Sequence, residues 1–172
     1  TMLQRGLNTP RTSSMGRLFD AIASLLGLCH RSSFEGQAAM QLEYAIDGHI
    51  TDATYPYLIH GEPLQFDYAP TIEAILQNLQ DRVSPAIISA TFHNTVVAGL
   101  VDIACRLRSQ YPELVKVVLT GGCFQNRYLL ERSIDQLQRH GFLVGYHHQL
   151  PSNDGGISAG QIVAALRFSS NK

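Results

Sequence analysis

The sequence has few charged residues and almost no excess of either sign. Only 16% of its 172 residues are Asp, Glu, Lys or Arg, and the formal net charge is −1. Without a basic excess, the chain has no general electrostatic attraction to nucleic acid or to an anionic membrane surface. We therefore expect no nucleic-acid or membrane partner, and any contact with a nucleotide must be made by a local site.

Cysteine is also scarce. The three cysteines, Cys29, Cys105 and Cys123, are far apart, and none belongs to a CxxC pair. This pattern indicates neither a disulfide framework nor a thiolate zinc site, and it favours a reducing, cytoplasmic location. The sequence also lacks an uninterrupted apolar run near the ~20 residues that a membrane-spanning helix needs. Residues 1–6 contain no secretory apolar region.

The residues that are present suit a packed globular chain. Hydrophobic residues make up 45% of the sequence, and its length suits one domain or one lobe of a larger two-lobed domain. Residues 1–14 are rich in Thr, Ser, Asn and Pro, which predicts a linker or a loop from a preceding lobe. Residues 15–172 are expected to form the folded lobe.

Apolar periodicity predicts four helices in the first two thirds of the chain. Their ranges are 16–28, 34–46, 70–79 and 85–109. The last two carry a proline near their first turn, a favoured position for that residue. The longest of them is expected to be buried along one face. Residues 56–68 predict two short strands of a hairpin.

The last third of the sequence alternates strands and helices. Strands are predicted at 115–119 and 142–146, and helices at 125–139 and 157–168. Such a β-α-β-α unit belongs to the α/β class, with parallel strands covered by helices and ligands at the carboxyl ends of the strands. The loops that follow the two strands are therefore expected to open onto the same crevice.

Each of these two strands ends in a glycine turn. Gly121 and Gly122 follow the first strand, and the segment 151–156 (PSNDGG) follows the second. The first amides of the next helix and its positive dipole end would face outward, an arrangement that suits phosphate. The turn is neither a Walker loop nor a dinucleotide fingerprint, because the required Lys-Ser or Lys-Thr and GxGxxG are absent. An ordinary tight turn explains the spacing equally well.

Polar residues in these turns have two readings each. Asn126 is placed to reach a phosphate or a ribose hydroxyl, although asparagine is also a common helix cap. Asp154 suits a divalent metal ion, but the Asn-Asp-Gly-Gly segment around it favours a turn in which Asp154 caps the helix that begins near Ile157. Cys123 lies at a helix start, yet free cysteines are usually small buried hydrophobes, so a catalytic cysteine is not expected.

Other acids and histidines give weaker signals. Asp20 lies in an apolar helix, where an acid either faces solvent at the helix edge or points into a cleft. The position of Glu35 in the first turn of its predicted helix indicates stabilisation of the helix dipole more than a role as a ligand. Among seven histidines only His147 and His148 are close in sequence. Neighbours on a strand point to opposite faces, so no complete metal site is predicted.

The sequence contains five segments that occur together: SSMGRLFDAIASLLGL, FEGQAAMQLE, TFHNTVV, LTGGCFQNRYLLE and PSNDGGISAGQ. In order and spacing they resemble the carbamoyltransferases of NiFe-hydrogenase maturation, the HypF family. The resemblance covers nearly the whole chain. The part of the family that the chain resembles is the C-terminal part of the large catalytic domain. That domain is itself similar to the universal proteins that make threonylcarbamoyladenosine on tRNA. The resemblance implies the second lobe of an actin, sugar kinase and Hsp70-like (ASKHA) α/β fold, with a mixed sheet covered by helices.

The resemblance also implies roles for residues of the two glycine turns. Asp154 matches the family aspartate that binds a divalent metal ion, zinc or iron, together with histidines of the first lobe, which lie outside this chain. Gly121, Gly122 and Asn126 match the loop that cradles the nucleotide. With the resemblance, a ligand role for Asp154 overtakes the cap interpretation.

Further positions follow from the same resemblance. Asp20 matches an acid near the nucleotide ribose in the tRNA-modifying relatives, and Glu35 with Gly36 falls where those relatives approach the nucleoside. His93 and Asn94 belong to the FHNT signature, on the long helix that lines the cleft, and no contact is assigned to either.

The reaction that the resemblance implies is a sequence of acyl transfers. Carbamoyl phosphate and ATP give carbamoyl adenylate at a separate domain, and this domain passes the carbamoyl group to the C-terminal cysteine of a partner hydrogenase maturation protein. The product leads to the cyanide ligand of the hydrogenase iron. The glycine loop would hold the phosphate while the metal stabilises negative charge. Since the histidine motif and the other domains are absent from this sequence, we expect activity only as part of a longer chain.

Two other classes stay open at this point. A lobe of a sugar kinase or acetate kinase-like phosphotransferase would transfer the γ-phosphate of ATP, although the FHNT and NDGG segments argue against it. A non-catalytic lobe that docks a partner protein would gain no stability from nucleotide, whereas a nucleotide-binding lobe would.

Overall fold

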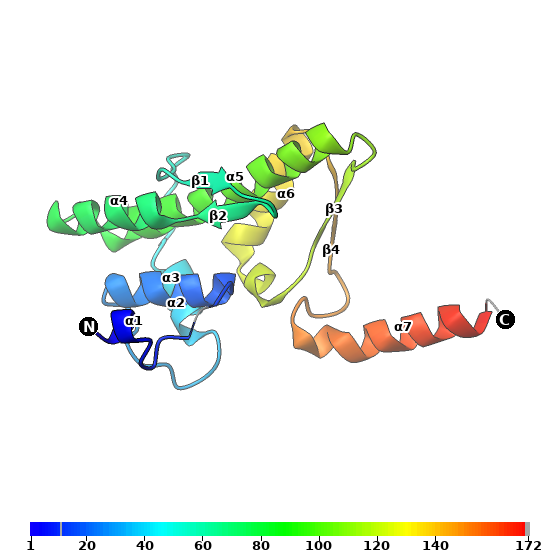
Figure 1. Cartoon of the computed structure of the whole chain (residues 1–172), viewed down its shortest axis with the longest axis horizontal. Helices are drawn as coiled ribbons and strands as arrows, with labels where there is room; N and C mark the ends of the chain where they lie inside the picture. The colour runs from blue at the N-terminus through cyan, green and yellow to red at the C-terminus, as the bar shows by residue number, and fades with distance from the viewer. Residues whose placement is uncertain (11, 171–172) are drawn as a thin grey trace. The chain divides into compact units, whose positions relative to one another are not determined.

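The chain divides into two units in the computed structural model, Thr1–Leu42 and Glu43–Lys172, and each is described by itself. The structure describes residues 1–10 and 12–170. Figure 1 shows the order of the elements along the chain.

Unit 1 contains α1 (Met2–Arg5), α2 (Met15–Leu25) and most of α3 (Gln37–Tyr44). The single turn α1 lies inside the segment predicted as a linker. α2 buries one apolar face, as its periodicity predicts, made of Leu18, Phe19, Ile22 and Ala23.

Glycines make these two helices shorter than the sequence pattern predicts. Gly27 has a φ of +72° and follows α2, where the Leu28 amide donates to the Ala23 carbonyl at 2.9 Å. This hydrogen bond and the left-handed glycine are the features of a helix C-cap. Gly36 has a φ of +81°, which is incompatible with an α-helix, so α3 starts at Gln37 and not at Phe34.

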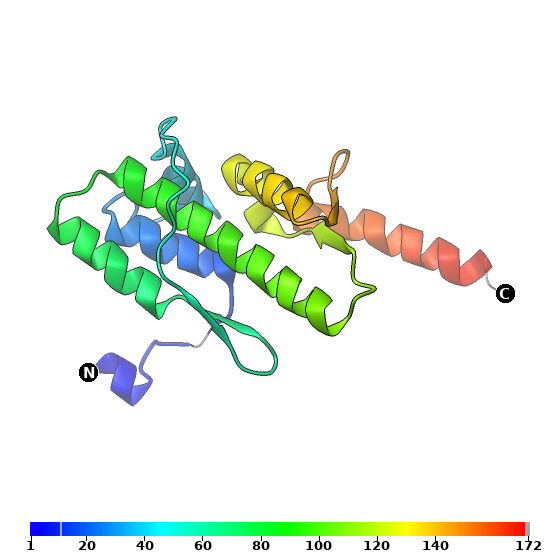
Figure 2. The same ribbon diagram turned by 90° about the horizontal axis from the view of Figure 1, so that it is seen from above.

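Unit 2 is organised around the long helix α5 (Pro85–Gln110), with α4 (Ala69–Gln80) lying beside it (Figure 2). The Ser84 hydroxyl caps α5 by accepting a hydrogen bond from the Ile87 amide at 3.4 Å, and Pro85 occupies the first helical position. Both helices match their predicted ranges to within a residue or two.

The burial of α5 is more extensive than predicted. Every residue from 88 to 97 is buried, so this part of the helix is enclosed on all sides and not along one face only. By length and composition α5 is able to span a membrane, but 67% of its apolar window is buried inside the chain. This is the burial expected of a core helix in a soluble protein.

The predicted hairpin is confirmed. β1 (Leu58–His60) pairs antiparallel with β2 (Gln65–Asp67), and Ile59 lies opposite Phe66. The hairpin packs closely on α5, because a Cβ atom at Gly99 would lie 2.4 Å from the Phe66 ring. Only glycine at this position allows the approach.

Gly99→Ala is expected to destabilise unit 2 by about 1–3 kcal/mol, the usual cost of inserting a methyl group into a packed interface. Urea unfolding followed by circular dichroism measures the change. Gly160→Ala is the matched control, because no atom lies within 4 Å of its Cβ position and alanine favours a helix. Equal stability of the two variants would contradict the close contact.

The last third of the chain has the predicted β-α-β-α order, with two short 3-10 turns added. Its elements are β3 (Lys116–Leu119), η1 (Gly122–Gln125), α6 (Arg127–Arg139), β4 (Leu143–Tyr146), η2 (Asp154–Gly156) and α7 (Ile157–Ser170). β3 and β4 pair in parallel, with Leu119 opposite Tyr146. α6 packs against both α5 and β4.

The strands of residues 1–10 and 12–170 form two separate two-stranded sheets, one antiparallel and one parallel. The single mixed sheet that the resemblance implies is therefore not seen, because the hairpin packs on α5 through Phe66 and its strands bond only each other. One face of the β3–β4 sheet is exposed. It carries Val118, which is 62% exposed, and Leu143, which is 64% exposed. α7 is exposed along residues 160–169, including its apolar side chains.

Candidate functional site

The two glycine turns lie next to each other, as predicted. Since β3 and β4 are parallel neighbours, both turns start from the same edge of the sheet. The Gly121 amide of the first turn donates to the Ser152 carbonyl of the second at 2.7 Å. Beside this bond, the Thr120 hydroxyl lies 3.0 Å from Nε2 of His147. The turns therefore form one continuous surface.

The backbone of the turns explains their glycines. Gly121 has a φ of +102° and a ψ of 160°, a conformation that is almost exclusive to glycine. A Cβ atom at Gly156 would lie 2.8 Å from the Pro151 carbonyl oxygen, so the second turn also needs glycine. Gly122 differs, because the nearest atom to its Cβ position is 4.0 Å away, on Asn153. The space at Gly122 is open, so a ligand can approach the backbone there.

Asn126 links the first turn to α6. Its side-chain oxygen accepts a hydrogen bond from the Leu129 amide at 2.8 Å, so the cap interpretation of this residue is correct. Its side-chain nitrogen lies 2.8 Å from Nε2 of His93. The residue is 9% exposed. Its predicted contact with a nucleotide stays a prediction.

The start of α6 does not offer free amides to an anion. The Glu43 carboxylate accepts hydrogen bonds from the amides of Arg127 at 2.7 Å and Tyr128 at 3.2 Å. With Leu129 bonded to Asn126, the first three amides of α6 have protein partners. The expectation that they face outward is wrong, because a carboxylate from the end of α3 already occupies the positive end of this helix. An incoming phosphate is left with the backbone of the turns.

His93 is fully buried on α5. Its Nδ1 lies 2.7 Å from the Ser89 carbonyl oxygen, and burial lowers its pKa from 6.5 to about 4. The imidazole is therefore neutral in the folded chain. The rings of Phe92 and Tyr128 meet it edge-on, with centroid distances of 5.9 and 5.5 Å.

Asn94, the next residue of the FHNT segment, fastens a different part of unit 2. Its amide nitrogen donates to the carbonyl oxygens of Thr51 at 2.7 Å and Ala53 at 3.1 Å, and its oxygen accepts from the Tyr128 hydroxyl at 3.0 Å. Sequence reasoning assigned no contact to His93 or Asn94. In the structure both join α5 to segments distant in sequence.

Asp154 is exposed at the start of η2. The side chain that caps this turn belongs to Asn153, whose oxygen accepts from the Gly155 amide at 3.0 Å. The cap of η2 is therefore Asn153, and no hydrogen bond of the Asp154 side chain with another described residue supports its interpretation as the cap of the helix that begins at Ile157. In the part of the chain that the structure describes, the Asp154 carboxylate makes no hydrogen bond or ion pair, and it is accessible to a cation.

A metal centre needs more than this carboxylate. Within residues 1–10 and 12–170, no three His, Cys, Asp or Glu side chains are grouped so that they could hold a metal ion. Zinc sites draw three or four ligands from the protein. The described residues do not by themselves fit a metal centre, and Asp154 can supply one ligand only. His147 and His148 lie beyond the end of β4 and have different contacts. His147 Nε2 is 3.0 Å from the Thr120 hydroxyl, whereas the His148 ring is tilted against that of Tyr146 with the ring centroids 4.1 Å apart.

The other predicted site residues belong to unit 1, outside the unit that carries the glycine turns. Asp20 forms an ion pair with Arg17 at 2.9 Å, and its side chain is 25% exposed. Glu35 is exposed, directly before the left-handed Gly36. Their proposed contacts with a nucleotide stay predictions.

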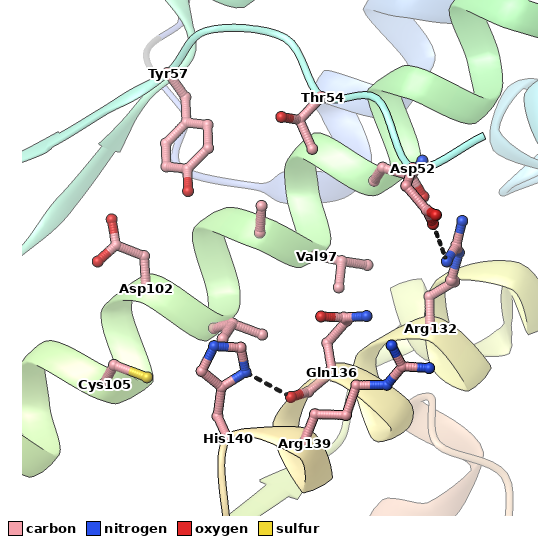
Figure 3. A pocket seen from close by; sticks show the side chains of 13 residues that line it. Asp52, Thr54, Tyr57, Val97, Asp102, Cys105, Arg132, Gln136, Arg139 and His140 are labelled. Carbon is pink, nitrogen blue, oxygen red and sulfur yellow. Dashed lines mark hydrogen bonds and ion pairs between the residues drawn. The ribbon is translucent and has the colours of Figure 1, made fainter.

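A pocket of about 500 Å³ in unit 2 is the main competing site (Figure 3). It lies between α5, α6 and the segment that contains Asp52 and Tyr57. Burial raises the pKa of the Tyr57 hydroxyl, and the negative charge of Asp102 adds to this effect. The acids at its rim are already paired, Asp52 with Arg132 and Asp102 with Arg106, both at 2.9 Å. None of the predicted site residues lines this pocket, so we favour the glycine turns.

Comparison with known proteins identifies the family. The family model described as carbamoyltransferase, Kae1-like domain, second subdomain, matches residues 1–161. The chain belongs to the HypF carbamoyltransferase family. The carbamoyltransferase HypF of Synechocystis sp. is 43% identical over 166 residues, which are 95% of this chain and 21% of that protein. The probable carbamoyltransferase HypF of Methanocaldococcus jannaschii is 31% identical over 168 residues, again covering 95% and 21%.

Solved HypF structures have the same fold over this length. A full-length HypF in a phosphate- and nucleotide-bound form matches with a TM-score of 0.89 and 42% identity, over 97% of this chain and 22% of that one. The T. kodakarensis HypF matches with a TM-score of 0.83 and 27% identity, over 98% and 22%. The chain thus spans about a fifth of these HypF proteins. The predicted family is confirmed, and the relatives that it matches are named carbamoyltransferases.

Proposed function

We propose that this chain forms the part of a carbamoyltransferase site that holds carbamoyl adenylate, made from carbamoyl phosphate and ATP. The acceptor is the C-terminal cysteine of a partner hydrogenase maturation protein, in the cytoplasm, and the product serves synthesis of the cyanide ligand of NiFe hydrogenase. The observation that carries the proposal is the hydrogen bond between Gly121 and Ser152, which joins two glycine turns at one sheet edge. The phosphate- and nucleotide-bound form of a HypF relative supports the choice of ligand.

The backbone of the turns is the part of this chain suited to the adenylate phosphate. Gly122 leaves space for close approach, and the unusual conformation of Gly121 turns the chain sharply at the end of β3. The cysteine thiolate attacks the carbamoyl carbon and forms the C–S bond, while the bond from that carbon to the phosphate oxygen breaks. AMP leaves with the electron pair. A backbone N–H group of the turns that reaches the phosphate would stabilise this leaving group.

Asp154 is proposed as one ligand of a divalent metal ion, zinc or iron, with the remaining ligands outside this chain. The carboxylate suits this role because it is exposed and makes no hydrogen bond or ion pair with other described residues. When bound, such an ion supplies Lewis-acid stabilisation of negative charge. We also propose that the Kae1-like subdomain is the second lobe of an ASKHA fold. Asp20, Glu35 and Gly36 remain proposed nucleoside contacts, on the family resemblance alone.

The proposal is testable in a chimera in which this chain replaces the matching 166-residue segment of the Synechocystis HypF. Gly122→Val is expected to weaken AMP binding at least about tenfold, because the side chain fills the space where phosphate approaches the backbone. Isothermal titration calorimetry measures the affinity. The fold is expected to be unchanged, since a Cβ atom at Gly122 meets only Asn153 at 4.0 Å.

Gly160→Val is the control, because it adds the same side chain at an open glycine outside the turns. Unchanged AMP affinity in Gly122→Val would remove the phosphate role of the first turn. If AMP fails to raise the unfolding temperature of the parent chimera, the non-catalytic docking lobe becomes the better reading, since a ligand of the folded state stabilises it.

A further inference from the structure

A chain of hydrogen bonds runs from the middle of α5 to the first glycine turn. The Ser89 carbonyl oxygen lies 2.7 Å from Nδ1 of His93, and Nε2 of His93 lies 2.8 Å from the side-chain nitrogen of Asn126. The side-chain oxygen of Asn126 lies 2.8 Å from the backbone amide of Leu129. Nδ1 is also 3.4 Å from the Ser89 hydroxyl. Beyond α5, the groups in this series of hydrogen bonds belong to Asn126 and Leu129, at the start of α6.

The direction of each bond is determined by the one before it. A carbonyl oxygen only accepts, so Nδ1 of His93 carries the proton and donates to Ser89. A neutral imidazole with a protonated Nδ1 presents Nε2 as an acceptor. The Asn126 group that faces Nε2 must then be its NH2, which leaves the oxygen of Asn126 for the Leu129 amide. The tautomer of His93 thus sets the orientation of Asn126.

The alternative orientation of Asn126 is unfavourable on both sides. A flipped amide would place its oxygen against the acceptor Nε2 and its NH2 against the Leu129 N–H. Both contacts would lose their hydrogen bonds in a region where His93 is 0% and Asn126 is 9% exposed. Water cannot replace the lost partners of groups buried to this extent.

The orientation of Asn126 matters for the first turn because this residue directly follows it. Asn126 is at once the C-cap of η1 and the N-cap of α6, and its backbone amide donates to the Cys123 carbonyl at 3.2 Å. A rotation of Asn126 would therefore move the backbone that comes just after Gly121 and Gly122. No side chain of this network lies at the open space beside Gly122.

We propose that His93 is the positioning residue of the nucleotide loop: as the Nδ1–H tautomer it orients Asn126, and Asn126 holds residues 121–125 in the conformation that receives phosphate. The inference rests on the proposed function. His93 touches no substrate and acts through Asn126 alone. This role gives the first polar residue of the FHNT segment a purpose distinct from that of Asn94, which fastens residues 51–53.

Two substitutions separate the two nitrogens of His93 in the chimera. In His93→Gln the longer amide places an oxygen where Nε2 stood, so Asn126 keeps its acceptor. In His93→Asn the shorter amide reaches only the position of Nδ1, so Ser89 keeps its donor while Asn126 loses its partner. AMP affinity is expected within about threefold of the parent for Gln, and about tenfold weaker or more for Asn.

Adenosine, which lacks the phosphate, is the second probe in the same titrations. If His93 positions the phosphate loop, His93→Asn loses the advantage of AMP over adenosine while its adenosine affinity is retained. A merely structural role lowers both affinities in step with the unfolding temperature. Equal AMP affinities of the Gln and Asn variants, or affinities that follow stability, would overturn the proposal.

A measurement without ligand keeps this inference separate from the proposed function. Nitrogen-15 NMR of the histidine ring is expected to show a protonated Nδ1 in the parent protein. The amide resonances of Gly121 and Gly122 are expected to shift in His93→Asn and to stay in place in His93→Gln. A protonated Nε2, or glycine resonances unaffected by both variants, would refute the positioning role. Failure of the parent to bind AMP would refute the proposed function instead.

Discussion

Replacing Asp154 by alanine is expected to abolish carbamoyl transfer by the chimera and to lower its content of bound divalent metal. Loss of residues that only support metal ligands costs about 10–100-fold in affinity or activity, so loss of a ligand itself is expected to cost at least about 100-fold. The fold is expected to survive, because the carboxylate is exposed and the cap of η2 is Asn153. Transfer assays and elemental analysis of the purified protein measure the two effects.

Asp81→Ala provides the control for this prediction. Asp81 is an exposed acid of the same unit, at the end of α4, and its only role in the described structure is local to that helix. It is expected to keep both transfer and metal. If Asp154→Ala also keeps both, Asp154 is not a metal ligand. If it loses transfer and keeps metal, the acid acts on the substrate and not through an ion.

Acidification is expected to unfold the chain in a way that depends on His93. Burial lowers the pKa of His93 to about 4, against about 6.5 in the unfolded chain, so the unfolded state binds more protons between these values. The stability associated with neutral His93 is complete above pH 6.5. It falls by up to ~1.4 kcal/mol per pH unit as the pH drops, and about 3 kcal/mol is lost by pH 4.

Urea unfolding of the wild type and of His93→Gln, at pH 7.5 and pH 4, measures this contribution. Glutamine does not titrate, so the free energy of unfolding of the variant should change by about 3 kcal/mol less between the two pH values. Other titrating groups contribute equally to both proteins and cancel. Parallel pH dependences would show that His93 is protonated as easily in the folded chain as in the unfolded one.

The helices and strands of this chain can be predicted from its sequence because the apolar periodicity agrees with the prolines and glycines that mark their ends. Apolar spacing predicts each long helix, and Pro85 predicts where α5 starts, with Ser84 as its N-cap in the structure. The shared position of the two glycine turns follows from a general rule, since a β-α-β crossover makes the two strands parallel neighbours. The ends of a helix differ from the predicted ends where the backbone conformation of a single residue determines them. The positive φ of Gly36, which starts α3 at Gln37, is an example.

The interactions that determine the chemistry of the turns are not readable in this way. Glu43 occupies the α6 amides from 84 residues away in sequence, and His93 meets Asn126 across 33 residues. No local pattern marks such pairs, since an isolated Glu or a buried His has several ordinary roles. Asn153 and Asp154 show the same limit at short range, because both are good caps and only the geometry of the turn selects Asn153.

The bond between Gly121 and Ser152 involves main-chain atoms only. Most side-chain replacements in either segment leave such a bond in place, whereas proline at position 121 would delete its donor. A force applied to one segment is therefore transmitted to the other without any intervening side chain. Under the proposed function, an anion bound at the first segment and a cation bound at the second would therefore be energetically linked.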